Sequence, residues 1–110
     1  MSATVAYVPD LMDRSRVAAA SGTVTFVTNL ADLPAAATEA DLVIVDLTRP
    51  GVLEMVPSLD GRVIGFANHT ERDLMDSARA AGCTTVLARS AFFSRLRELL
   101  APDPDAPPAP

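Results

Sequence analysis

The chain has 110 residues, enough for one domain, and 49% of them are hydrophobic, which is sufficient for a buried core. Nine arginines, no lysine and fourteen acidic residues give a net charge of −5, which argues against nucleic-acid binding because phosphate contacts need a positive surface. No apolar run approaches a membrane span of roughly 20 residues, and no signal-peptide pattern is visible, so we expect a cytoplasmic protein without a membrane partner. A single cysteine, Cys83, excludes an internal disulfide and a cysteine-built metal site; we expect it to be a small buried residue.

The first part of the chain alternates strand and helix patterns. Thr4–Val8 and Thr23–Val27 are rich in β-branched and aromatic residues, which predicts strands. Leu11–Ala20 lies between them and predicts a helix. A loop over Thr28–Ala31 is expected to precede a second helix, Leu33–Ala40, whose proline stands in the first turn, where proline is tolerated.

The same alternation continues to residue 100. In chain order we expect a strand at Leu42–Val45, a short helix at Gly51–Val56, a strand at Val63–Phe66, a helix at Thr70–Ala81, a strand at Thr84–Leu87 and a helix at Ala91–Leu100. Thr70 followed by Asp73 is close to a capping box, and Gly82 is a stop signal. Phe92 and Phe93 are consecutive and cannot share one helix face, so we expect one in the core and the other at the surface.

Five strands alternating with five helices predict an α/β fold with a parallel sheet and helices on both faces. Strands that are apolar at consecutive positions, as in LVIV and VIGF, are typical of such a buried sheet. The spacing favours the flavodoxin-like doubly wound arrangement with strand order 2-1-3-4-5. We therefore expect one domain over residues 1–100. Half of the residues in the tail, 101–110, are proline, so we expect that segment to be disordered.

Several sequence motifs of enzymes and nucleotide-binding proteins are missing. The turn after the first strand, Pro9–Asp13, has no glycine for a bound pyrophosphate, and no phosphate-binding loop of the G-x-x-x-x-G-K-[ST] type occurs. No G-x-S-x-G nucleophile motif occurs either. We therefore expect neither a nucleotide-binding enzyme nor a hydrolase.

Polar residues follow the strands at the edge where an open parallel sheet binds its ligands. Asp10 follows the first strand and Asp46 the third, while His69 follows the fourth and Arg89-Ser90 the fifth. Two carboxylates in one cleft are suited to a hard cation. A guanidinium beside them can pair with a carboxylate or with a phosphoryl oxygen.

The segment Leu42-Val43-Ile44-Val45-Asp46-Leu47-Thr48-Arg49-Pro50-Gly51 resembles the phosphoacceptor region of bacterial response-regulator receiver domains. The shared pattern is an apolar strand, an aspartate, and Pro-Gly four residues later, and the resemblance extends over about residues 4–100. It implies that Asp46 stands at the phosphoacceptor position. It also implies that Asp10, Asp46 and the carbonyl of Thr48 are the groups that would bind Mg²⁺. Apart from this Mg²⁺ ion, we expect no cofactor.

The remaining family positions differ in this chain. The acidic pair after the first strand is reduced to Pro9-Asp10, and Phe66-Ala67 stands where the family has a hydroxyl residue followed by a small one. Arg89-Ser90 replaces the Lys-Pro of the family, and the fifth strand, Thr84–Leu87, has no aromatic switch residue. These differences favour a degenerate receiver, or pseudo-receiver.

Each of these polar residues also has a purely structural explanation. Asp46 is able to hydrogen-bond its own loop, and Asp10 is able to cap the helix that follows it. For Arg89 the structural explanation is neutralisation of the carboxylates. For His69 it is that a polar residue before a helix is ordinary, although His69 is the one side chain that titrates near pH 7.

The leading hypothesis is a non-catalytic, receiver-like signalling or interaction module that works without phosphorylation of Asp46. Its partner would be a separate protein, and the resemblance also makes a homodimer plausible. One alternative is an atypical single-domain response regulator phosphorylated at Asp46. Another is a flavodoxin-like domain that binds a small molecule at the carboxyl ends of its strands.

Overall fold

The computed structural model describes residues 3–100, so the expected disorder of the tail, 101–110, lies outside the described residues. Five parallel strands form one sheet, in the order β2-β1-β3-β4-β5. They are β1 (Thr4–Tyr7), β2 (Val24–Phe26), β3 (Leu42–Asp46), β4 (Arg62–Ala67) and β5 (Thr85–Ala88). The strands and the sheet order predicted from the sequence are thus confirmed to within two residues at each end.

The helices also follow the predicted alternation. They are α1 (Leu11–Ala20), α2 (Leu33–Ala37), α3 (Val52–Met55), α4 (Arg72–Ala81), α5 (Arg89–Ser94) and α6 (Leu96–Leu100), with short 3₁₀ turns η1 (Leu30–Asp32) and η2 (Val56–Ser58). Within residues 3–100, none of these helices has the length and apolar character needed to cross a membrane.

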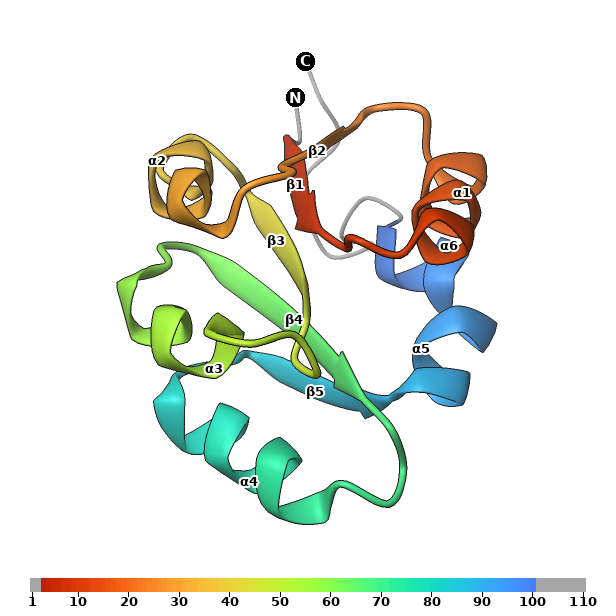
Figure 1. Cartoon of the computed structure of the whole chain (residues 1–110). Coiled ribbons are helices and arrows are strands. Elements are labelled where there is room, and N and C mark those ends of the chain that lie inside the picture. The colour runs from red at the N-terminus through yellow and green to blue at the C-terminus, as the bar shows by residue number, and fades with distance from the viewer. Residues whose placement is uncertain (1–2, 101–110) are drawn as a thin grey trace, which may run out of the picture.

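Figure 1 shows the helices in two layers, one on each face of the sheet. Alternate side chains of β3 and β4 point into different layers. Val43 and Val63 pack with the residues of α2, α3 and α4, whereas Ile44, Ile64 and Phe66 pack with those of α1, α5 and α6. All five residues of β3 are buried, as expected for a strand in the middle of a doubly covered sheet.

The second and third predicted helices differ in extent. Part of the expected loop before α2 is the 3₁₀ turn η1, which begins where the side chain of Asn29 accepts a hydrogen bond from the backbone N–H of Ala31. The helix expected up to Ala40 ends at Ala37, and α3 passes into η2 because Pro57 cannot continue the α-helical hydrogen bonds.

The capping box predicted at Thr70 is wrong. The helix α4 begins at Arg72, and Thr70 belongs to the turn before it. That turn closes on itself, because the backbone N–H of Glu71 donates to the carbonyl of Asn68 (2.9 Å) and the Asn68 amide donates to the Glu71 carboxylate (2.8 Å). The first helical residue is consequently two positions later than the sequence pattern indicated.

The expectation that one of Phe92 and Phe93 is exposed is also wrong, since both are buried. Phe92 stacks on Phe66 with ring centroids 4.6 Å apart, and Phe93 meets the same ring edge-on at 5.6 Å. The outer side of Phe93 is covered by the guanidinium of Arg16, which lies 4.1 Å from the ring centroid. Arginine side chains thus bury an aromatic ring that helix geometry alone leaves at the surface.

The single helix expected over Ala91–Leu100 is two short helices. Arg95 separates α5 from α6, with backbone angles of φ −105° and ψ 11° that interrupt the helical hydrogen bonds. The break re-aims the chain so that Leu96 is buried in the same layer as Phe92.

Candidate functional site

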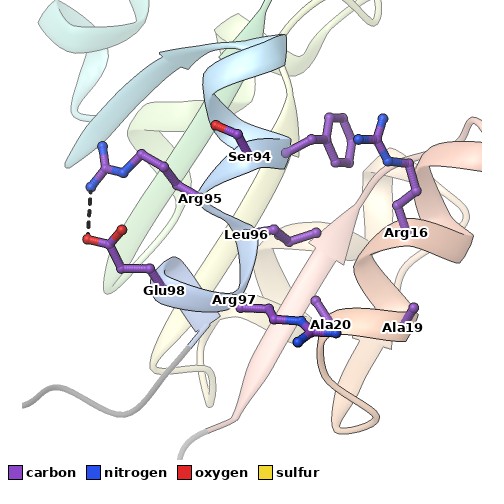
Figure 2. Close-up of a pocket in the computed structure, with 9 residues that line it drawn as sticks. Arg16, Ala19, Ala20, Ser94, Arg95, Leu96, Arg97 and Glu98 are labelled. Atoms are coloured by element: carbon purple, nitrogen blue, oxygen red, sulfur yellow. Dashed lines mark hydrogen bonds and ion pairs between the residues drawn. The ribbon is translucent and has the colours of Figure 1, made fainter.

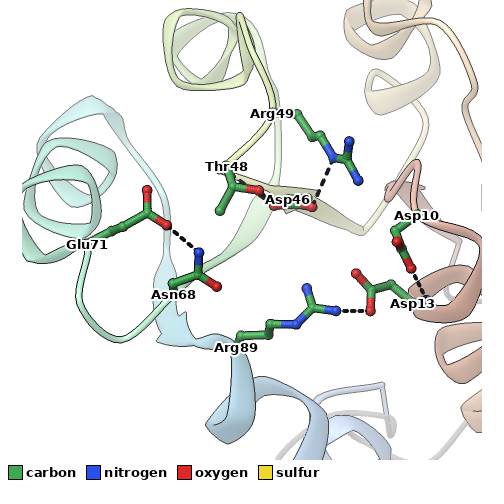
Figure 3. Close-up of polar contacts among 8 residues, drawn as sticks. All are labelled: Asp10, Asp13, Asp46, Thr48, Arg49, Asn68, Glu71 and Arg89. Carbon is green, nitrogen blue, oxygen red and sulfur yellow. Dashed lines mark hydrogen bonds and ion pairs between the residues drawn. The ribbon is translucent and has the colours of Figure 1, made fainter.

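The carboxyl ends of β1, β3 and β5 lie at the edge of the sheet where the sequence analysis placed the site. Figure 3 shows Asp10, Asp46 and Arg89 there, converging from three separate elements. Two residues that were not predicted, Asp13 and Arg49, complete the cluster. The arrangement therefore contains three carboxylates and two guanidinium groups.

Asp46 is the most constrained carboxylate of this cluster. It ends β3, its side chain is buried, and one carboxylate oxygen accepts from the backbone N–H (3.0 Å) and the hydroxyl (2.6 Å) of Thr48. The other oxygen accepts from Nε of Arg49 at 3.4 Å. Asp46 thus organises the loop after β3, which is the structural explanation considered above. Its counter-ion is Arg49.

Asp10 caps α1, the other structural role considered above. Its carboxylate accepts a hydrogen bond of 3.0 Å from the backbone N–H of Asp13. That hydrogen bond is the largest influence on the side chain and lowers the pKa of Asp10 below its ordinary value, with smaller contributions from Arg89 and Arg49. The carboxylate is therefore held in its charged form beside two cations.

Asp13 is the carboxylate that the sequence analysis missed. It lies in the first turn of α1, its side chain is only 2% exposed, and it forms an ion pair with Arg89. The guanidinium of Arg89 also lies over the rings of Phe66 and Phe93, at 5.8 and 5.2 Å from their centroids. Arg89 is consequently held between a buried carboxylate and two aromatic rings.

The remaining predicted residues take no part in these contacts. Thr48 supports Asp46 through its hydroxyl, whereas Ser90 is exposed in the first turn of α5. His69 is exposed and lines a separate cavity of about 420 Å³ beside α4 and the end of β5. No hydrogen bond within residues 3–100 connects His69 to the carboxylates, so the structure does not bring it into the cluster.

The resemblance implies a divalent cation bound by the carboxylates of this cluster. A Mg²⁺ ion takes carboxylate oxygens whose charge is free to bind it. Here the oxygens of Asp46 accept from Thr48 and Arg49, and Asp13 is paired with Arg89. Among the residues that the structure describes, no three acidic, histidine or cysteine side chains are grouped closely enough to hold a metal ion. Two of the three carboxylates of the cluster, Asp46 and Asp13, are thus already paired with the protein's own guanidinium groups.

A sequence signal for Asp13 does exist. Asp13 and Val17 are four residues apart and are the two buried residues of α1, so Asp13 lies on the helix face that meets the sheet. A charged residue on that face requires a partner. The partner is 76 residues further along the chain, which no local pattern indicates.

Comparison with known proteins supports the fold. No protein-family model matches the sequence, and no curated protein matches it significantly. Among solved structures, a response regulator from Hahella chejuensis is similar over 90% of this chain and 92% of that chain, with a TM-score of 0.76 and 16% identity. A response regulator from Thermotoga maritima has a TM-score of 0.74 and 18% identity, covering 91% of this chain and 95% of that one.

The chemotaxis protein CheY4 of Vibrio cholerae is similar to the same degree, with a TM-score of 0.76 and 17% identity over 91% of this chain and 96% of that one. The chain therefore has the flavodoxin-like fold of response-regulator receiver domains. At these identities the likeness concerns the fold.

Proposed function

We propose that this protein is a receiver-like signalling module that acts by binding a separate protein, without catalysis and without phosphorylation at Asp46. The observation that carries the proposal is the internal charge pairing at the sheet edge: Arg89 is committed to Asp13, and the carboxylate of Asp46 is engaged by Thr48 and Arg49. A phosphoryl group arriving at Asp46 would have to compete with Asp46 for Arg49 and with Asp13 for Arg89.

Two neighbouring positions support the same conclusion. Phe66 lies beside Asp46 in the register of β3 and β4, and its buried ring stacks on Phe92. It has no hydroxyl with which to hydrogen-bond a phosphoryl oxygen. The residues of β5 are Thr, Val, Leu and Ala, so this strand offers no aromatic ring that could move in response. The site is therefore suited to holding one conformation.

A contact with another protein is favoured by the exposed start of α1. Leu11 and Met12 are 75% and 77% exposed, and they stand directly after Asp10 at the edge of the charged cluster. Large apolar side chains in such a position are typical of surfaces that a partner covers. A protein bound there would contact both the apolar pair and the charged cluster.

The test is a titration of the full chain with Mg²⁺ and beryllofluoride, a phosphoryl mimic, followed through the backbone amide spectrum. We expect no global shift at millimolar concentrations. The Asp46→Asn variant should retain its fold and its oligomeric state, as should Asp60→Asn, which makes the same charge change at an exposed position. Saturable shifts in α4 and β5 that disappear in Asp46→Asn would overturn the proposal and establish Asp46 as a phosphoacceptor.

A further inference from the structure

A groove of about 580 Å³ lies between α1 on one side and α5 and α6 on the other. From α1 it is lined by Arg16 and by the small side chains of Ala19 and Ala20, which leave space that larger residues would fill. Figure 2 shows the guanidinium groups of Arg16 and Arg97 at opposite ends of this groove, with Leu96 between them. The α1–α6 groove, as we call it, therefore has an apolar floor and a cationic group at each end.

The arginines at the two ends of the groove have no acidic partner within residues 3–100. Both are exposed, and the ion pairs in this part of the chain involve other arginines. Arg95 is the third arginine of the groove, and it is paired with Glu98 at 3.4 Å. Arg16 is held in place by the ring of Phe93, whose centroid lies 4.1 Å from its guanidinium carbon. Two cationic groups thus remain available to acidic side chains.

The segment that follows α6 has a charge opposite to that of the groove. Residues 101–110 read APDPDAPPAP, with two aspartates and no basic residue. The helical segments 10–20 and 89–100, which form the groove, carry five arginines and three acidic residues. Opposite charges in neighbouring segments of one chain attract each other.

This acidic segment is also long enough to return to the groove. Asp103 is three residues beyond Leu100, where α6 ends, so it reaches up to about 10 Å from that point. Arg97 precedes the same point by three residues, or about 4.5 Å along a helix. Asp105 lies two residues after Asp103, roughly 6 Å further along a polyproline chain. The two carboxylates are therefore spaced along the chain, as the two guanidinium groups are spaced along the groove.

From this arrangement we propose that residues 101–110 bind in the α1–α6 groove of their own chain as an extended segment. Asp103 pairs with Arg97, Asp105 is directed towards Arg16, and the prolines contact the apolar floor. A segment without a core of its own, for which the sequence pattern predicts disorder, is still able to bind in this way. Its attachment to α6 gives an effective concentration in the millimolar range, on the order of 1 mM, so weak contacts suffice. Proline also has little conformational freedom to lose on binding. This contact does not depend on the function proposed above.

The experiment measures the heteronuclear ¹H–¹⁵N NOE of the full chain over a tenfold range of protein concentration. This quantity reports the fast motion of each backbone amide. The amides of Asp103, Asp105 and Ala106 should give values close to those of α6, independent of concentration. Values typical of a freely moving chain would overturn the proposal. Ordering that appears only at the higher concentration would also overturn it, because the groove would then bind the segment of a second copy.

Charge reversal tests the proposed pairing of Asp103 with Arg97. Arg97→Glu should release the segment, seen as a loss of the NOE at residue 103, and the double variant Arg97→Glu/Asp103→Arg should restore it. Arg62→Glu makes the same charge change at the exposed start of β4 and should leave the NOE unchanged. Equal loss in Arg62→Glu and Arg97→Glu, or no recovery in the double variant, would overturn the proposal.

A second variant leaves residues 1–100 intact and so avoids any loss of folding caused by a change in α6. Asp103→Asn/Asp105→Asn should shift the backbone amide signals of residues 16–20 and 93–98, because these residues line or flank the groove. The matched control is Glu54→Gln/Asp60→Asn, which removes two charges at exposed positions elsewhere. The control should leave those signals in place. Unchanged groove signals in Asp103→Asn/Asp105→Asn would show that the segment does not bind there.

Discussion

The ion pair between Asp13 and Arg89 predicts an asymmetric response to mutation. The side chain of Asp13 is 2% exposed and that of Arg89 is 41% exposed. Replacing Arg89 by alanine leaves a carboxylate in a buried position, whereas replacing Asp13 leaves a guanidinium that water can reach. Arg89→Ala should therefore destabilise the fold more than Asp13→Ala does.

The magnitude follows from the burial of the two side chains. Removing one partner of a fully buried pair costs about 3–5 kcal/mol. Arg89 is partly exposed, so water would enter in its place and reduce that cost, and we expect about 2 kcal/mol for Arg89→Ala. For a domain of this size that corresponds to a fall in melting temperature of about 10 °C.

Urea denaturation followed by circular dichroism measures the free energy of unfolding for both single variants and the double variant. The double-mutant cycle removes the separate loss of the contacts between Arg89 and Phe93 and isolates the pair, for which we expect a coupling energy of about 1–2 kcal/mol. The exposed pair Arg79–Asp76, with a distance of 2.9 Å and side-chain exposures of 51% and 75%, is the matched control and should give less than about 0.5 kcal/mol. A coupling energy for Asp13–Arg89 no larger than that of the control would refute the reasoning.

Three further predictions concern the core, the helix cap and the thiol. Ile44→Ala, in the fully buried central strand, should lower the free energy of unfolding by about 2–5 kcal/mol in urea denaturation, and a loss below about 1 kcal/mol would contradict the central position of β3. Folding lowers the pKa of Asp10, so its charge stabilises the protein above about pH 4, and this stabilisation is lost as the pH falls through the lowered pKa. Asp10→Ala should therefore be less stable than the wild type at pH 7, and the difference should shrink in acid. Urea denaturation at several pH values would detect this change. Burial raises the pKa of the Cys83 thiol to about 11, so the native protein should react with a thiol reagent at pH 8 far more slowly than the urea-unfolded chain; equal rates would show that the thiol is accessible.

The pattern of apolar residues in the sequence was sufficient to predict the architecture of the fold. Runs such as Leu42–Val45, apolar at every position, are stable only in a strand covered on both faces, and their alternation with helices requires parallel crossovers. The carboxyl ends of parallel strands share one edge of the sheet, which is why Asp10, Asp46 and Arg89 all lie at that edge. Each of these inferences depends only on near neighbours in the chain and on general topology.

What each charged side chain does was decided by tertiary packing. Asp13 acquires its partner from a helix start 76 residues away, and Phe93 is buried because Arg16 and Arg89 cover it from two different helices. Pairing across such separations depends on how α1 and α5 pack on the same face of the sheet. A periodic pattern records which face of its own helix a residue occupies, but it carries no information on the side chain that the fold brings opposite.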